Sequence, residues 1–302
     1  MRHILSTVLF ILPILYCNIL FGSTLKVVTT IKPIHSLVSS VTDGILTPDL
    51  LFYHSSLQNY ILKPSDARYL AASDVIFYID DHLETFVSTF AKTNKKIVEL
   101  SHTVNLLPNR KYFLSQLIST MDSEKDLNFW LNPENAKNMI YCISATLSEL
   151  DSENAYKYHA NALKMIKKID QEAQKIMSEL ESVMHQKYIV TNDTYQYFEQ
   201  YFRLNSPSAI LDIDEDAYLG VKSIIKIKRL MTQENIKCIF SNSWDMSNNI
   251  KPKILSQDAK IVILDSMGFN VAPGKDAYLA IMNGIAREFR SCFVDSLTQC
   301  RE

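Results

Sequence analysis

The segment between residues 151 and 184 has the most regular hydrophobic pattern in the chain, and it constrains the fold more than any other feature. Its apolar positions recur at steps of three and four residues, as on one face of an α-helix: Ala155, Tyr158, Ala162, Ile166, Ile169, Ala173, Ile176, Leu180 and Val183. Asp151 stands where it can cap the start of this helix. At a rise of about 1.5 Å per residue the helix would be roughly 50 Å long, which is about the length of a whole small protein.

Two interpretations of this helix are open. A coiled-coil seam would need further heptads, and the chain does not supply them. A strut packed along two lobes needs only one apolar stripe, so we favour the strut. The charged residues between the stripe positions then form a solvated face: Lys164, Lys167, Lys168, Glu172, Glu179 and Glu181.

On both sides of this helix, β-branched runs alternate with helical patterns. Before it, strands are expected at 25–30, 46–53, 74–79 and 96–100, and helices at 33–41, 63–72, 83–91 and 133–150. After it, strands are expected at 187–191, 238–241 and 261–265, and helices at 193–202, 218–232, 249–256 and 276–294. Asp193 is placed to cap the first of these later helices. The alternation predicts an α/β fold with two lobes, each a small, mostly parallel sheet flanked by helices, joined by one long helix.

The N-terminus predicts export. Arg2 and His3 precede an almost wholly apolar run over 4–21, which Gly22 and Ser23 follow. We expect the mature chain to be periplasmic or otherwise extracytoplasmic; an uncleaved anchor is the alternative, because about 18 apolar residues can just span a bilayer. The expected organisation is a signal peptide over 1–23, an N-terminal lobe over 24–150, a linking helix over 151–185 and a C-terminal lobe over 186–302.

Charge and motif content exclude two large classes of function. The chain has 31 Lys and Arg against 33 Asp and Glu, with no basic stretch long enough to neutralise many phosphates, so nucleic-acid binding is not expected. It has no nucleophile elbow, glycine-rich phosphate loop, Cys-x-x-Cys or His-Glu-x-x-His motif. None of its 7 histidines pairs with another at metal-ligand spacing. We therefore expect a binding protein and not an enzyme.

Beyond the signal the chain has the cysteines Cys142, Cys238, Cys292 and Cys300. In an exported chain, Cys238 on a strand and Cys292 on the last helix could tie that helix to the second sheet. The alternative is that all of them are buried free thiols.

Several short segments, in a fixed order, carry a resemblance to a known family. They are 30–38 (TIKPIHSLV), 60–68 (YILKPSDAR), 130–136 (WLNPENA), 192–198 (NDTYQYF) and 264–268 (LDSMG). Together they resemble the zinc-uptake substrate-binding proteins of ABC transporters, over nearly all of the mature chain. The resemblance implies lobes joined by a rigid helix, a metal ion held between them, a membrane permease as partner and a monomeric protein. Cys238 and Cys292 fall where many members carry a disulfide.

The resemblance also places the family's metal site, and there this chain departs from the pattern. In the family, three histidines and one carboxylate bind zinc; here the three histidine positions are Gln58, Asn128 and Asn192. Asn242 stands where some members have a glutamate, and only Asp265 keeps its type. The His/Asp-rich loop that usually precedes the second ligand is also missing.

These departures bear on the cargo. Zinc prefers imidazole and thiolate ligands, whereas amide oxygens suit hard ions such as calcium. We predict that the zinc site is degenerate, and that the cargo is a small polar or cationic solute or a hard metal ion. For a metal, the alternative is a mixed site of His54, Asp126, Asp245 and Asp265. For the function, the alternative is a ligand-independent surface-interaction or adhesion-like role on the same scaffold. His35 is expected to be a satisfied histidine beside the first strand rather than a ligand.

Overall fold

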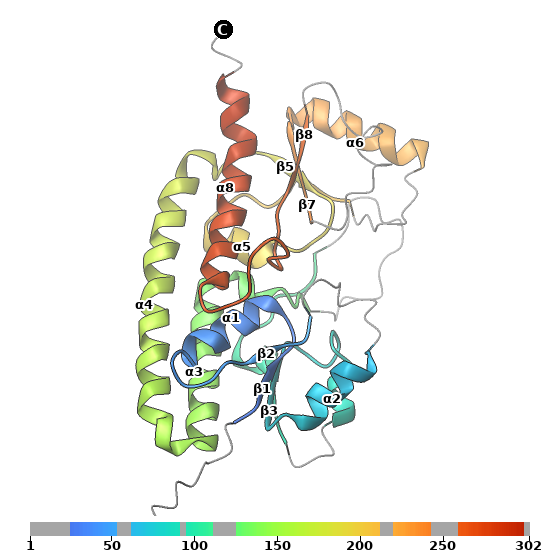
Figure 1. The fold of residues 1–302 in the computed structure, drawn as a ribbon. Helices are drawn as coiled ribbons and strands as arrows, with labels where there is room; N and C mark the ends of the chain where they lie inside the picture. Colours follow the sequence, from blue (N-terminus) through green and yellow to red (C-terminus); the bar gives the residue numbers. More distant parts are fainter. Residues whose placement is uncertain are drawn as a thin grey trace, which may run out of the picture.

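The computed structural model describes residues 25–52, 62–90, 95–110, 125–211, 220–242 and 259–298, which form two lobes around two parallel sheets (Figure 1). The strands are β1 Val27–Thr29, β2 Asp49–Leu50, β3 Val75–Tyr78 and β4 Lys96–Glu99 in the first sheet, and β5 Tyr188–Val190, β6 Ala209–Ile210, β7 Cys238–Ser241 and β8 Lys260–Ile263 in the second. The strand orders are β2-β1-β3-β4 and β6-β5-β7-β8, with every pair parallel. The second lobe thus repeats the first, and the predicted fold class is confirmed.

The central strands are apolar along their whole length because both faces of each sheet are covered. β3 (VIFY), β5 (YIV) and β7 (CIFS) are buried at every position. Such continuous apolar runs are typical of parallel strands with helices on both sides. Ile76 of β3 pairs with Val28 of β1, and Ile239 of β7 pairs with Ile189 of β5, so the two sheets have matching central ladders.

The helices of the described residues are α1 Lys32–Val41, α2 Pro64–Ala72, α3 Pro133–Leu150, α4 Ala155–Leu180, α5 Gln196–Tyr201, α6 Val221–Glu234 and α8 Ala277–Thr298. α1, α2 and α3 each have proline in the first turn, where its missing N–H costs no hydrogen bond. At α3 the side chain of Asn132 accepts a hydrogen bond from Glu134 N at 2.8 Å and caps the helix.

α4 runs along one side of the molecule and contacts both lobes (Figure 1). Its buried residues are Tyr158, Ala162, Met165, Ile169, Ala173, Ile176 and Leu180. They follow the predicted apolar stripe except that Met165 is buried, whereas the predicted Ile166 and Ala155 are only half-buried. The helix packs against α1 and α3 of the first lobe and against α8 of the second. One hydrophobic core continues from the first sheet through α3 and α4 to the second sheet. The strut interpretation therefore fits the structure, and the shared core favours a rigid arrangement of the lobes.

The ends of α4 differ from the prediction. Short 3₁₀ helices over Ser152–Asn154 and Glu181–Val183 flank it, so the buried apolar stripe continues beyond the end of the α-helix to Val183. Asp151 does not cap α4. It follows α3, and its carboxylate accepts hydrogen bonds from Tyr158 Oη at 2.8 Å and from Asn154 Nδ2 at 2.9 Å. The residue stabilises the corner between the two helices rather than the first turn of the second.

Two other elements also differ from the prediction. The helix expected at 83–91 is instead a set of turns ending in a 3₁₀ helix over Val87–Phe90. Glu84 accounts for this difference. Its carboxylate accepts hydrogen bonds from the backbone N–H groups of Ile79 and Asp80, which folds the segment back onto the end of β3. The two-residue strand β6 was not predicted.

Some expected elements lie outside the described residues, namely the signal segment 1–23 and the helix at 249–256. Among the helices that the structure does describe, none combines the length and the apolar character that crossing a membrane requires.

Cys238 and Cys292 form a disulfide that joins β7 to α8, with their Cα atoms 6.0 Å apart. Both residues are buried. The predicted pairing is confirmed, and Cys142 is a free, half-buried thiol. Around the bridge, the ring of Phe289 on α8 stacks on Phe240 of β7 with centroids 4.6 Å apart. The last helix is thereby fixed to the second sheet both covalently and by packing.

Candidate ligand site between the lobes

The second sheet positions three of the predicted site residues at one edge. Asn192 follows β5, Asn242 follows β7 and Asp265 follows β8. These strands are parallel neighbours, so their carboxyl ends meet, and ligands of open α/β sheets bind at that edge. Asn128 comes from the first lobe, directly before the 3₁₀ helix Phe129–Leu131. Gln58, His54 and Asp245 lie outside the described residues.

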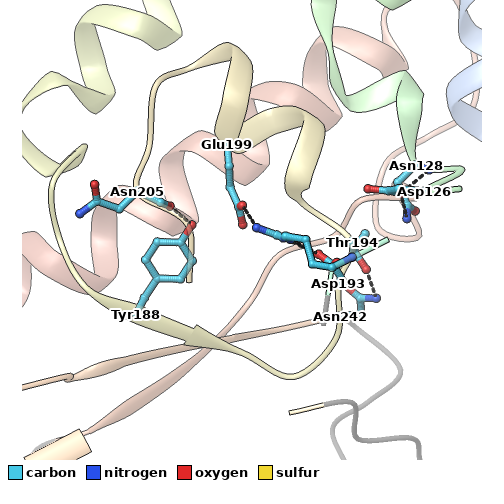
Figure 2. Close-up of polar contacts among 9 residues, drawn as sticks. Asp126, Asn128, Tyr188, Asp193, Thr194, Glu199, Asn205 and Asn242 are labelled. Carbon is cyan, nitrogen blue, oxygen red and sulfur yellow. Dashed lines mark hydrogen bonds and ion pairs between the residues drawn. The ribbon is translucent and has the colours of Figure 1, made fainter. Parts of the chain in front are cut away.

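Asp126 and Asn128 form a local pair on the first-lobe side of the site (Figure 2). Asp126 Oδ1 accepts hydrogen bonds from Asn128 N at 2.9 Å and from Asn128 Nδ2 at 2.8 Å. With the Gln196 amide oriented so that its nitrogen faces them, Gln196 donates to Asp126 Oδ2 and to Pro108 O, both at 3.2 Å. Asp126 is only 2% exposed. Its carboxylate is therefore engaged by amide groups of both lobes.

Asn242 is held by residues of its own lobe. Its Nδ2 donates to Thr194 Oγ1 at 3.0 Å, a contact visible in Figure 2, and its Oδ1 accepts from Tyr195 Oη. Tyr195 Oη lies within 2.6 Å of Leu264 O as well. Both ends of this amide thus hydrogen-bond to the loop after β5, which fixes its orientation and leaves one N–H donor and one oxygen lone pair for a ligand.

Asp265 differs from the amide positions. Its Oδ2 accepts a hydrogen bond from Asn270 N at 3.1 Å, which closes the turn that follows β8. Its Oδ1 is buried and has no hydrogen-bond partner within the described residues. A buried carboxylate oxygen without a donor is costly unless a ligand or ion satisfies it. Among the predicted site residues, Asp265 therefore has the clearest capacity to bind a cation or a donor group.

An ion-pair cluster that was not predicted crosses between the lobes beside these residues. Arg110 Nε donates to Asp193 Oδ1 at 2.8 Å, its backbone N donates to Asp193 Oδ2 at 3.2 Å, and its Nη1 donates to Glu199 Oε2 at 2.5 Å. The side chains of Arg110, Asp193 and Glu199 are 18%, 5% and 4% exposed. In Figure 2 the carboxylates of Glu199 and Asp193 lie on either side of the side chain that pairs with both, which is that of Arg110. Burial raises the pKa of Glu199, and the charge of Arg110 opposes that rise.

The prediction that Asp193 caps a helix is therefore wrong. α5 begins at Gln196, and no side chain caps its first turn. The carboxylate of Asp193 is taken by Arg110: Nε and Nη2 of the guanidinium both donate to Oδ1, and the backbone N donates to Oδ2. Charge-assisted bonds of this kind are stronger than a capping bond. One signal in the sequence points to such a cluster: Glu199 is the one acidic residue in the aromatic segment 195–202 (YQYFEQYF), and a buried carboxylate needs a cation.

The same region anchors the two ends of segment 108–125 to the second lobe. Pro108 and Lys125 form an isolated antiparallel β-bridge. Tyr197 Oη accepts a hydrogen bond from Leu107 N at 2.8 Å and donates to Asp126 O at 3.0 Å. Both ends of the segment are thus fixed on α5. His35 plays no part here: it is 6% exposed, and its Nε2 hydrogen-bonds to Pro48 O at 3.1 Å, as predicted for a satisfied histidine.

The buried carboxyl of Asp126 makes stability depend on pH. Burial raises its pKa to about 7; the charge of Asp193 adds to the rise, and hydrogen bonds from Asn128 and the charge of Arg110 oppose it. In the unfolded chain the pKa of an aspartate is about 3.9. Between pH 4 and 7 the unfolded chain therefore releases this proton while the folded protein keeps it, and the contribution of Asp126 to stability falls as pH rises. Asp126→Asn removes this dependence and keeps an acceptor for Asn128. From pH 5 to pH 8 the variant is expected to gain about 2 kcal/mol relative to wild type.

Urea unfolding of both proteins at several pH values measures this difference. Glu84, whose pKa burial also raises to about 7, is present in both proteins, so its contribution cancels. Asp276→Asn is the matched control, because Asp276 is exposed. Parallel pH profiles for wild type and Asp126→Asn would contradict the assignment.

Comparison with known proteins decides the family. The family model of the periplasmic zinc-uptake complex component A, ZnuA, matches residues 27–292. The chain belongs to the ZnuA family. The high-affinity zinc uptake system protein ZnuA of Brucella abortus (strain 2308) is 28% identical over 312 residues, covering 90% of this chain and 93% of the relative. The ZnuA protein of Yersinia pestis is 24% identical over 289 residues, covering 88% and 90%.

Solved structures of ZnuA-like proteins have the same fold. A crystal structure of ZnuA superposes with a TM-score of 0.73 at 17% identity, covering 89% of this chain and 99% of the other. The zinc-bound AdcA of Streptococcus pneumoniae superposes with a TM-score of 0.72 at 17% identity, covering 89% of this chain and 57% of the longer AdcA chain. ZnuA family membership confirms two predictions: the chain is a substrate-binding component of a zinc-uptake type importer, and it is not an enzyme.

The described part of the ZnuA-like site contains few metal donors. Within residues 25–52, 62–90, 95–110, 125–211, 220–242 and 259–298, no three His, Cys, Asp or Glu side chains gather as a metal would require. Asp265 is the only carboxylate among Asn128, Asn192, Asn242 and Asp265, so its buried Oδ1 is the acceptor of these four that best fits a cation.

Proposed function

We propose that this ZnuA-family protein binds its cargo between the lobes at Asp265 and delivers it to a membrane permease of an ABC importer. The match to the family model over residues 27–292 carries this proposal. The comparisons do not favour the alternative of a ligand-independent, adhesion-like role. An extracytoplasmic location agrees with membership of a family of periplasmic zinc-uptake components, and the disulfide agrees with an oxidising compartment. Cleavage of a signal peptide over 1–23 and a monomeric state belong to the same proposal.

We divide the mature chain for this role into an N-terminal lobe over 24–150, a linking helix over 151–185 and a C-terminal lobe over 186–302. The two sheets with the same strand order support this division. The site lies where the lobes meet, at the carboxyl ends of the second sheet. The lobes share one hydrophobic core, so we expect cargo binding to require only small relative movements.

The donor set at the site determines the cargo that we propose. We place Gln58, Asn128 and Asn192 at the family's histidine positions, on the resemblance of the segments that flank them. An amide oxygen is a weaker ligand for zinc than an imidazole nitrogen. We propose a polar or cationic solute or a hard metal ion as cargo, with zinc bound much more weakly than by a site built from histidines. If a metal is bound, His54, Asp126 and Asp245 are the further donors that we propose.

Isothermal titration of the mature protein with zinc tests the weakened site. We expect no one-to-one binding with a dissociation constant below about 1 μM, because one carboxylate with amide partners retains little of the roughly 10–16 kcal/mol of a structural zinc site. Asp265→Ala removes the one retained ligand, and Asp276→Ala is the control for loss of an exposed carboxylate. Sub-micromolar binding that Asp265→Ala abolishes and Asp276→Ala preserves would contradict the weakened site.

A further inference from the structure

Lys32 is a buried lysine that reaches from one lobe into the ligand site of the other. It is the first residue of α1 and is only 3% exposed. Its Nζ donates to Val271 O at 2.8 Å, to Gly268 O, and more weakly to Phe269 O at 3.4 Å. All three carbonyls belong to the turn that follows Asp265. The ammonium group of the first lobe is thus held by the second lobe, in the turn that follows the site's one retained carboxylate.

The turn that receives Lys32 has a fixed shape. Gly268 has a φ of +70°, and a Cβ at this position would lie 2.6 Å from a side-chain atom of Ile281. Only glycine fits such a position without displacing its neighbour. Asp265 Oδ2 closes the same turn by accepting from Asn270 N at 3.1 Å. The positive charge of Lys32 and the negative charge of Asp265 are therefore both fixed to one short, rigid turn.

The two charges interact electrostatically. Burial lowers the pKa of the Lys32 ammonium, and the negative charge of Asp265 acts against that decrease. No direct ion pair joins Lys32 Nζ to the Asp265 carboxylate among the described contacts, so the two charges act on each other across the turn, where partial burial strengthens their interaction relative to water. A cation that approaches Oδ1 of Asp265 meets the repulsion of Lys32 as well as the attraction of the carboxylate.

We propose that Lys32 is an internal counter-ion of Asp265 and a specificity-determining residue of the site. This inference rests on the proposed function, since it concerns the same site. Because Lys32 balances the negative charge of Asp265, the site discriminates against free divalent cations. It favours a cargo with little or no net charge that donates hydrogen bonds to Oδ1 of Asp265. The chemical class is a small neutral or zwitterionic polar solute. A lysine in the first turn of a helix near the lobe boundary controls the charge of a site on the other lobe.

A double-mutant cycle with metal ions as probes tests the proposal. Lys32→Gln removes the positive charge and keeps a hydrogen-bond donor for the turn, whereas Lys32→Arg keeps the charge. Each variant is made in the wild-type background and in the Asp265→Asn background. Zinc chloride and calcium chloride are titrated calorimetrically into each protein. We expect Lys32→Gln to bind at least one of the two ions at least about tenfold more tightly than wild type when Asp265 is present. With Asp265→Asn the same change is expected to be less than about twofold, and Lys32→Arg should resemble wild type.

The outcomes separate this inference from the proposed function. An equal gain in both backgrounds, no gain at all, or no binding by any variant would overturn the counter-ion role. If Asp265→Asn weakens binding while Lys32→Gln changes nothing, the site stands and the counter-ion fails. If Asp265→Asn changes binding in no background, the proposed site at Asp265 fails as well.

A stability measurement keeps the proposal testable should Lys32→Gln not fold. Asp265→Asn alone leaves the Lys32 ammonium buried without its counter-charge, so the urea midpoint is expected to fall further than for Asp276→Asn, whose carboxylate pairs with Lys168 on the surface. Equal midpoints for the two variants would overturn the counter-ion role.

Discussion

Arg110→Met is expected to lower the free energy of unfolding by about 3–5 kcal/mol, because it leaves two buried carboxylates without their cation. Asp193 and Glu199 are 5% and 4% exposed, and Arg110 supplies the hydrogen bonds that offset their desolvation. Methionine fills a similar volume, so the loss is electrostatic rather than a cavity effect. Urea unfolding monitored by circular dichroism measures it. The loss should be larger at pH 8 than at pH 5, because burial raises the pKa of Glu199 and the variant lacks the Arg110 charge that opposes this rise.

The matched control removes the whole cluster. In the background Asp193→Asn with Glu199→Gln, Arg110→Met leaves no uncompensated charge and should cost much less than in wild type. Arg287→Met tests the loss of an exposed arginine, whose side chain is 73% exposed, and should change stability by less than about 0.5 kcal/mol. If Arg110→Met cost no more than Arg287→Met, the cluster would not hold the lobes together as its geometry indicates.

This cluster also shows what local sequence patterns cannot predict, namely an ion pair between residues far apart in the chain. Asp193 follows a strand and precedes a helix, which is the local pattern of a capping residue, and the prediction followed that pattern. Its true partner, Arg110, is 83 residues away along the chain. No periodicity links residues so far apart, and an arginine in a loop normally faces solvent. Long-range ion pairs of this kind depend on how the lobes dock, which local patterns do not encode.

Elements whose signals are local were predicted well. α3 begins and ends where expected, at Pro133–Leu150, because Asn132 caps it and proline occupies its first position. The strands β3, β4 and β7 were found as short apolar runs with β-branched residues. The helix expected at 83–91 failed because one side chain, Glu84, bonds the backbone at the end of β3 and redirects the chain. Such a contact depends on tertiary position, not on propensity.

The site was predicted in part by resemblance and in part not at all. Three of the family positions, Asn192, Asn242 and Asp265, do meet at the edge of the second sheet, since parallel strands place their carboxyl ends together. Their roles as cargo ligands stay predictions. Lys32 was not singled out, because the first residue of a helix is usually solvated, and only the docking of the lobes buries it. Residue types at the site were thus accessible from sequence, whereas their partners were not.

Removing the disulfide is expected to have an effect of similar size through a different mechanism. Cys238 and Cys292 are separated by 54 residues, and closing a loop of that length lowers the entropy of the unfolded chain by an amount worth about 4 kcal/mol at 25 °C. The variant Cys238→Ser with Cys292→Ser should lose about this much stability, measured by urea unfolding in the absence of reductant. Reduction of wild type should reproduce the loss, while Cys142→Ser, a change at a free thiol, should have little effect.

Removing the disulfide also tests whether the bridge helps to position the candidate site. The bridge fixes β7 to α8, and β7 leads directly into Asn242, while the first turns of α8 contact the first lobe: Tyr278 N donates to Ser36 Oγ at 2.8 Å, and Tyr278 Oη donates to Trp130 O at 3.0 Å. α8 therefore couples the second sheet to the lobe boundary. If the serine variant unfolds at a lower urea concentration yet keeps wild-type cargo affinity, packing alone positions the site. If cargo affinity falls together with stability, the disulfide also holds the carboxyl ends of the second sheet in position against the first lobe. The reason is that a loosened α8 would release the hydrogen bonds of Tyr278 to Ser36 and to Trp130 together.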